Sequence, residues 1–91
     1  MADDVPQLED LVEFPTPWTF RAVGATTPAL SSQCRQAVEA STGRAVVDLD
    51  SKPSSKGRWT AVRVKVVVQS ADEVRAAYAA LRGVEGVIKC L

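Results

Sequence analysis

The segment of this 91-residue chain best suited to chemistry is a basic, turn-rich stretch over residues 52–58. It lies between two strand-like runs, residues 45–50 and 59–69. Its cations supply charge, its hydroxyls donate hydrogen bonds, and its glycine lets the backbone approach a ligand closely. The candidate ligand-binding residues are Lys52, Ser54, Ser55, Lys56, Gly57 and Arg58. A solvated hairpin end explains the same composition without a ligand and is the simpler interpretation.

This segment is not a phosphate-binding P-loop. That motif needs the pattern GxxxxGK[ST] between a strand and a helix, whereas residues 52–58 join two strands and lack the first glycine.

A second candidate surface follows from the alternation over residues 59–69. Val62, Val64, Val66 and Val68 point to one side, and the residues between them point to the other. With cations from other strands, the outward set predicts an open-face binding surface of Arg21, Trp59, Arg63, Lys65 and Lys89, facing Asp48 and Asp50. RNA-recognition domains use such a face, but Arg58 and Thr60 stand where stacking aromatics are needed. Cross-strand charge pairs, or a covering second subunit, explain the face as well.

The turn over residues 24–27 is a third candidate, because a helix N-terminus attracts anions. Thr27 is a plausible N-cap and Pro28 fits the first helical position. A turn and cap without any ligand is the preferred interpretation.

No catalytic apparatus is predicted. The chain has no histidine, and its two cysteines, Cys34 and Cys90, fall on inward positions, where we expect small buried hydrophobic side chains. Asp48 and Asp50 share one side of a strand, but we expect exposure at an edge to leave the pKa values of both carboxyls unperturbed and the pair chemically idle. We therefore expect no enzyme, no cofactor and no metal site.

Charge is segregated along the chain although the net charge is zero. The first 17 residues hold five of the eleven acidic residues and no cation, so the remainder carries a net charge of +5. We predict two parts: an acidic, proline-containing arm over residues 1–17 and one domain over residues 18–91. The N-terminus lacks the pattern of a secretory signal and no apolar run could cross a bilayer, so we expect a cytoplasmic protein without membrane contact.

The periodicities predict six elements. Strands are expected over residues 18–23, 46–50, 59–69 and 86–91, with Ile88 and Cys90 on one side of the last strand. One helix should end near Ser41 before Gly43, and a second should start at a capping box over residues 70–73 and stop at Gly83. The order is that of a ferredoxin-like βαββαβ fold of the α+β class, a two-layer sandwich with two helices on one face of a four-stranded antiparallel sheet.

Two segments carry a resemblance to a known family. Residues 8–24 (LEDLVEFPTPWTFRAVG) and residues 52–59 (KPSSKGRW) resemble the YbeD-like family of small bacterial proteins of unknown function. The similarity spans residues 8–91. It implies a bacterial, cytoplasmic protein with a fold similar to ACT-type regulatory domains, and it implies no activity or ligand residues.

The expected function is that of a non-catalytic regulatory or adaptor domain. Its expected partners are a protein, including a second copy through a sheet edge or the open face, or a small anionic metabolite. The alternative is a nucleic-acid-binding module on the basic face, which we rank below these partners.

Overall fold

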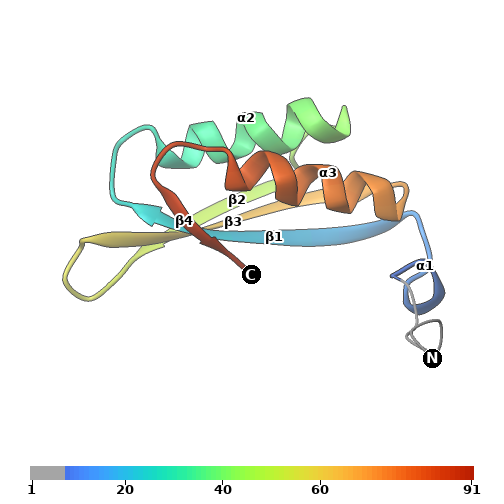
Figure 1. The fold of residues 1–91 in the computed structure, drawn as a ribbon, viewed down its shortest axis with the longest axis horizontal. Coiled ribbons are helices and arrows are strands. Elements are labelled where there is room, and N and C mark those ends of the chain that lie inside the picture. Colours follow the sequence, from blue (N-terminus) through green and yellow to red (C-terminus); the bar gives the residue numbers. More distant parts are fainter. Residues whose placement is uncertain (1–7) are drawn as a thin grey trace.

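A four-stranded antiparallel sheet with two helices on one face forms the structure (Figure 1). The computed structural model describes residues 8–91. The elements are α1 (Leu8–Leu11), β1 (Thr16–Ala25), α2 (Leu30–Thr42), β2 (Asp48–Pro53), β3 (Trp59–Val68), α3 (Ala71–Arg82) and β4 (Val87–Cys90). The strand order is β2-β3-β1-β4, so β2 and β4 are the edges. The predicted ferredoxin-like βαββαβ fold is confirmed.

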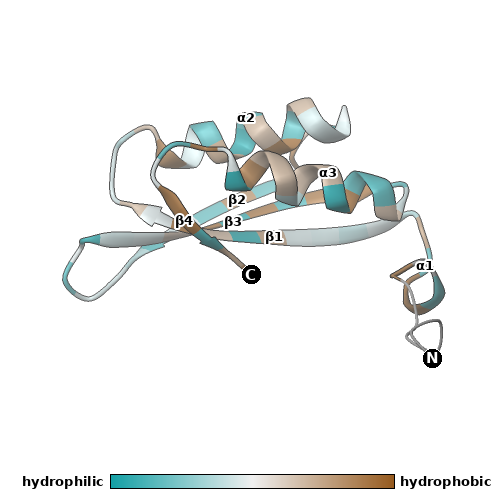
Figure 2. Cartoon of the chain, viewed as in Figure 1, coloured by the Kyte–Doolittle hydropathy of each residue, from teal (hydrophilic) through white to brown (hydrophobic). Residues whose placement is uncertain are grey.

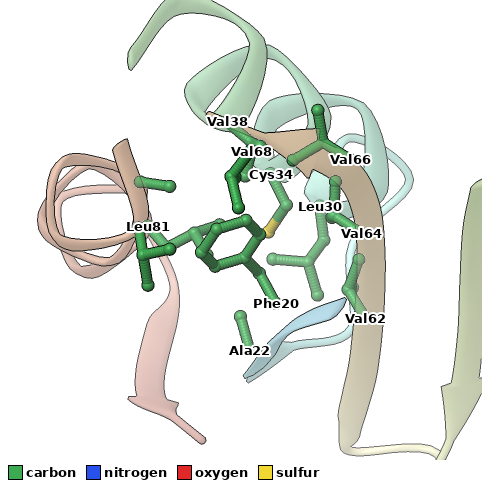
Figure 3. Close-up of a cluster of buried hydrophobic side chains, with 12 residues drawn as sticks. Phe20, Ala22, Leu30, Cys34, Val38, Val62, Val64, Val66, Val68 and Leu81 are labelled. Carbon is green, nitrogen blue, oxygen red and sulfur yellow. The ribbon is translucent and has the colours of Figure 1, made fainter. Parts of the chain in front are cut away.

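The central strand β3 shows the predicted alternation over its full length. Val62, Val64, Val66 and Val68 are each at most 1% exposed, and the residues between them are exposed. The four valines meet Phe20 and Ala22 of β1 and the inner sides of both helices (Figure 3). One side of the sheet is thus buried under α2 and α3, and within residues 8–91 the odd-numbered side of β3 is left exposed.

Helix α2 starts later than its sequence suggests. Its N-cap is Ala29, which makes no side-chain capping bond, so the prediction of Thr27 as the cap was wrong. The backbone N–H of Leu30 instead donates to the Thr27 carbonyl across a turn, at 3.3 Å. The helix ends as predicted at Gly43, whose φ of 69° is the left-handed conformation that glycine adopts readily.

Helix α3 begins at the predicted cap. The Ser70 hydroxyl accepts a hydrogen bond from the Glu73 backbone N–H at 3.3 Å. The Glu73 carboxylate in turn accepts a hydrogen bond from the N–H of Gln69, one residue before the cap, at 3.0 Å. Arg44 also donates to Glu73 at 3.1 Å, which ties the segment after α2 to the start of α3.

The last strand breaks the predicted alternation. Ala22 pairs with Cys90 and Val23 with Lys89, but Gly24 pairs with Val87, so a register shift leaves Ile88 as the extra residue. Val87 and Cys90 pack against the core, and Ile88 is 62% exposed. The prediction that Ile88 and Cys90 share a side was therefore wrong.

The predicted N-terminal arm falls partly outside the described residues, because residues 1–7 are not described. Within residues 8–17, Leu8 of α1 and Phe14 pack against the core as partly buried side chains. The division of the chain at residue 17 stays a prediction.

Candidate functional site

The open face of the sheet is built by the odd-numbered residues of β1 and β3. Their register places Arg21 opposite Arg63 and Thr19 opposite Lys65. The edge strand adds Asp50 beside Arg63 and Asp48 beside Lys65. Because directly opposed residues of paired strands share a face, all six side chains project away from the helices.

These six side chains line a polar hollow of 230 Å³, which we call the charge cluster: Thr19, Arg21, Asp48, Asp50, Arg63 and Lys65. Arg63 donates to Asp50, and this ion pair is half exposed. The hydrogen bond and the charge of Arg63 lower the pKa of the Asp50 carboxyl from its ordinary value of 3.8. The expectation that an exposed edge would leave Asp50 unperturbed was wrong.

Arg21 and Lys65 form no ion pair with any described residue, and Arg21 also has no acid opposite it in the neighbouring strand β3. Arg21 lies directly opposite Arg63, a like-charged arrangement that costs stability in a sheet. Asp50 already forms an ion pair with Arg63, and Arg21 pairs with no acid among residues 8–91. The open face therefore retains positive charge at Arg21, suited to a carboxylate or phosphate from a ligand or partner.

The other two predicted open-face residues lie away from this hollow. Lys89 pairs with Val23, and Trp59 pairs with Ala25, so both belong to the opposite end of the same face. The structure thus brings together Arg21, Arg63 and Lys65, and it separates Lys89 and Trp59 from them.

The predicted basic loop is shorter than its sequence suggests, because β2 continues to Pro53. Lys52 is therefore a strand residue on the open face, opposite Ala61. The remaining loop projects beyond the helices at the end of the β2–β3 hairpin, where Figure 2 shows mainly polar residues.

Hydrogen bonds within the hairpin end fix the shape of this loop. The Ser54 N–H donates to the Trp59 carbonyl at 2.7 Å, and the Trp59 N–H donates to the Ser54 hydroxyl at 3.3 Å. The Gly57 N–H donates to the Ser54 carbonyl at 2.8 Å, with Gly57 at a φ of 74°. The loop is thus a tight turn, and its residues 54–58 are all exposed.

Two hollows flank Trp59 at this end of the sheet. One, of 450 Å³, is lined by Ser54, Ser55, Lys56, Arg58 and Trp59. The other, of 540 Å³, is lined by Trp59, Ser54 and Ser55 together with Val23, Lys52, Pro53 and Ala61. Val23, Pro53 and Ala61 were not among the predicted site residues. Val23 could have been predicted from the sequence, because it lies two residues after Arg21 in the same strand and therefore shares its face.

The turn before α2 has a structural role. The hydroxyls of Thr26 and Thr60 lie 2.7 Å apart, and the Thr26 N–H donates to the Arg58 carbonyl at 3.1 Å. A Cβ on Gly24 would lie only 2.9 Å from the Gly86 carbonyl oxygen, so the turn packs tightly against the start of β4. Thr26 is thus committed to holding β1 against β3.

The cysteines lack the setting of a nucleophile. Cys34 is fully buried, and desolvation, with a smaller contribution from nearby Cys90, raises its pKa to about 11. Desolvation also raises the pKa of Cys90, against a smaller opposing effect of Arg82. Both thiols stay protonated at neutral pH, whereas catalytic cysteines require a lowered pKa.

Within residues 8–91 no cluster of three or more acidic or cysteine side chains could hold a metal ion. None of the described helices has the length and apolar character that crossing a bilayer requires.

Sequence comparison decides the family. The profile described as "Protein of unknown function (DUF493)" matches residues 9–91. This chain belongs to that family. A "UPF0250 protein" from Shewanella sp. (strain ANA-3) is 33% identical over 87 residues, covering 93% of this chain and 96% of the relative. One from Haemophilus influenzae (strain PittEE) is 31% identical over 85 residues, covering 93% and 91%. The predicted resemblance to YbeD-like bacterial proteins of unknown function is confirmed.

Solved structures agree on the fold of this family member. Protein HP0495 from H. pylori aligns with a TM-score of 0.75 at 18% identity, covering 88% of this chain and 85% of that one. The ACT domain from the GTP pyrophosphokinase of Chlorobium tepidum aligns with a TM-score of 0.66 at 16% identity, covering 84% and 83%. At these identities the likeness establishes an ACT-like fold and no activity.

Proposed function

We propose that this chain is a non-catalytic regulatory or adaptor domain that self-associates through the β2 edge and binds an anionic ligand or protein partner. The observation that carries the proposal is the edge strand β2. All six of its side chains are exposed, and its outer side pairs with no strand of the described chain. An unpaired strand edge is a template for pairing with another chain.

The register of the hairpin shows which β2 groups face outward. Ser54 and Trp59 form a backbone hydrogen-bonded pair in register with the β2–β3 ladder. Hydrogen-bonded and non-bonded pairs alternate in an antiparallel ladder, so Asp48, Asp50 and Lys52 bond inward to β3. Leu49, Ser51 and Pro53 therefore direct their backbone groups to the outer edge. Proline sits where its missing N–H removes no bond of this sheet.

A second copy can complete this edge around a two-fold axis. If Leu49 pairs with Ser51 of the second copy, both outward N–H groups gain acceptors and Pro53 stays outside the paired region. The same register sets Asp48 directly opposite Lys52 of the second copy on the open face. It also brings the two copies of Leu49, 36% exposed in one chain, next to each other. The register also sets Asp50 opposite Asp50 of the second copy, and each of these carboxylates is already paired with Arg63 of its own chain. The two Asp48–Lys52 pairs and the apolar contact are therefore opposed by one acidic pair that Arg63 screens.

The ACT-like fold supports a binding role rather than catalysis, by analogy of fold alone. The described side chains offer Arg21 as an unneutralised cation and no activated nucleophile or base. Asp48 and Asp50 lie along the β2 edge of the open face, beside Arg63 and Lys65, where they would repel a phosphate backbone lying across that edge. Nucleic acid along this face is for that reason the lesser alternative.

A charge swap tests the edge. Asp48→Lys and Lys52→Asp should each lower the mass found by size-exclusion chromatography with light scattering, because each sets like charges opposite one another. The double variant should restore the mass of the dimer, because opposite charges at positions 48 and 52 then again face each other, in exchanged places. A strict monomer for the unmodified chain at high concentration refutes self-association, and two singles that still dimerise refute this register.

A further inference from the structure

Trp59 is the aromatic side chain that the fold leaves available between the apolar and cationic parts of the hairpin end. It is 37% exposed, whereas the core ring of Phe20 is 0% exposed. It lines one hollow together with the apolar residues Val23, Pro53 and Ala61, and a second hollow together with the basic loop. A half-exposed indole in such a position offers a face on which a planar ring can stack.

The loop beside Trp59 carries more hydrogen-bond donors than the fold uses. The backbone N–H groups of Ser55, Lys56 and Arg58 donate to no residue within 8–91. Lys56 and Arg58 form no ion pair with any described residue. The Ser54 and Ser55 hydroxyls line the same hollow. Two cations, two hydroxyls and three backbone amides without an acceptor among residues 8–91 are therefore gathered in one short turn.

This donor set suits a phosphate better than a carboxylate. A carboxylate has two oxygens, whereas a phosphate monoester presents three strong acceptor oxygens and up to two negative charges. The charge cluster is a poorer place for that group, because Asp48 and Asp50 share it. The phosphate is accordingly expected at the hairpin end.

We propose that the hairpin end binds a phosphorylated molecule with a planar ring, the ring stacked on Trp59 and the phosphate held by Lys56, Arg58 and the loop amides. Nucleotides are the chemical class. A free mononucleotide and the end of a single strand present the same chemistry. The inference rests on the proposed function, since it specifies the anionic ligand, but it does not require the β2 edge to pair.

Nuclear magnetic resonance titration of the ¹⁵N-labelled full chain with AMP tests the site. The two tryptophans give separate indole signals. Trp18 is partly buried and donates to the Tyr78 hydroxyl at 3.4 Å, so it serves as the internal control. AMP should shift the Trp59 indole and the amides of Ser55, Lys56 and Arg58, and leave the Trp18 indole in place. Adenosine and inorganic phosphate should each bind with an affinity at least about tenfold lower than that of AMP, because each makes only half of the contacts.

Variants separate this site from general attraction to positive charge. Arg58→Ala should weaken AMP binding about tenfold through loss of a charge-assisted contact. Arg35→Ala removes the same charge from the exposed side of α2 and should leave the affinity unchanged. Trp59→Phe should retain more affinity than Trp59→Ala, because phenylalanine keeps a ring for stacking.

A short oligoribonucleotide distinguishes a free mononucleotide from the end of a single strand as the natural ligand. Binding no tighter than AMP, with shifts confined to the hairpin end, supports a free nucleotide. Much tighter binding with added shifts at Arg21 and Lys65 supports a strand end. Absence of hairpin-end shifts with both probes overturns the proposal, as does an equal loss in the Arg35 and Arg58 variants. Either result would leave self-association through β2 standing, because light scattering tests that proposal separately.

Discussion

Phe20 is the residue on which the sheet and both helices meet. Its ring is fully buried, lies edge-on to Tyr78 at a centroid distance of 5.0 Å, and is 6.4 Å from the ring of Trp18. Figure 3 shows the Cys34 sulfur beside it and Leu81 on the opposite helix. The ring thereby fills the space between α2 and α3 above β1.

We predict that Phe20→Ala lowers the free energy of unfolding by about 3–5 kcal/mol, because the deletion leaves a cavity between sheet and helices. Val67→Ala, on the open face at 36% exposure, is the control and should change it by about 0.5 kcal/mol or less. Urea denaturation followed by circular dichroism measures both. Equal effects of the two substitutions would mean that the core is not centred on Phe20.

Thiol reactivity provides a second prediction at this scale. Iodoacetamide should modify Cys90 before Cys34 in the folded chain, because Cys34 is fully buried and its pKa is raised to about 11. Mass spectrometry of peptides along a time course measures the order. In denaturant the two rates should become similar. Fast modification of Cys34 in the native chain would contradict the burial described here.

At the scale of single elements, the start of α3 is held by more polar contacts than the start of α2. Ser70 caps α3, and Glu73 receives bonds from Gln69 and Arg44, whereas Ala29 gives α2 no side-chain cap. The segment after α2 and the first turn of α3 are therefore coupled through one carboxylate.

Removing the cap should distinguish the two helices. Ser70→Ala should lower the free energy of unfolding by about 1 kcal/mol, the usual contribution of a serine N-cap. Thr27→Ala, at the predicted cap that caps nothing, should have an effect of about 0.5 kcal/mol or less. Thermal unfolding of both variants in parallel is sufficient, and a larger effect at Thr27 would reverse the assignment of the caps.

The pH dependence of stability should report on Glu73. Its hydrogen bond from Arg44, then that from the Gln69 N–H, lowers its pKa below the ordinary value of 4.5. A carboxyl with a lowered folded-state pKa stabilises the fold above its unfolded-state pKa, and this contribution is lost as the pH falls through the folded-state value. Glu73→Gln should therefore flatten the stability profile below about pH 4.5. Profiles of parallel slope in both proteins would exclude this role.

Elements with an uninterrupted period could be predicted from the sequence, and those shaped by neighbouring strands could not. The alternation of β3 and the capping box of α3 are local patterns. The bulge at Ile88 arises because β4 pairs with β1 around Gly24, and β2 reaches Pro53 because that edge position needs no N–H. The cluster of Arg21, Arg63 and Lys65 followed from strand parity alone. The separation of Trp59 and Lys89 from it required the register.

At the scale of the molecule, the described residues 8–91 leave one face and the two edge strands of the sheet uncovered. Helices α2 and α3 lie on one side (Figure 1), and the opposite side carries the charge cluster at one end and Trp59 at the other. The hollow beside Trp59 adjoins the β2 edge at Lys52 and Pro53, while Lys56 and Arg58 lie beyond the strand in the loop. We therefore expect one molecule to accommodate a second copy along β2 and a phosphate at the loop.

Native mass spectrometry of the purified full-length chain tests the central claim of a paired, ligand-binding domain most directly. We predict the mass of two chains, with a retained phosphorylated ligand visible as an added mass that Arg58→Ala removes. A spectrum containing only single chains without any added mass would contradict both the pairing through β2 and the ligand site at the hairpin end.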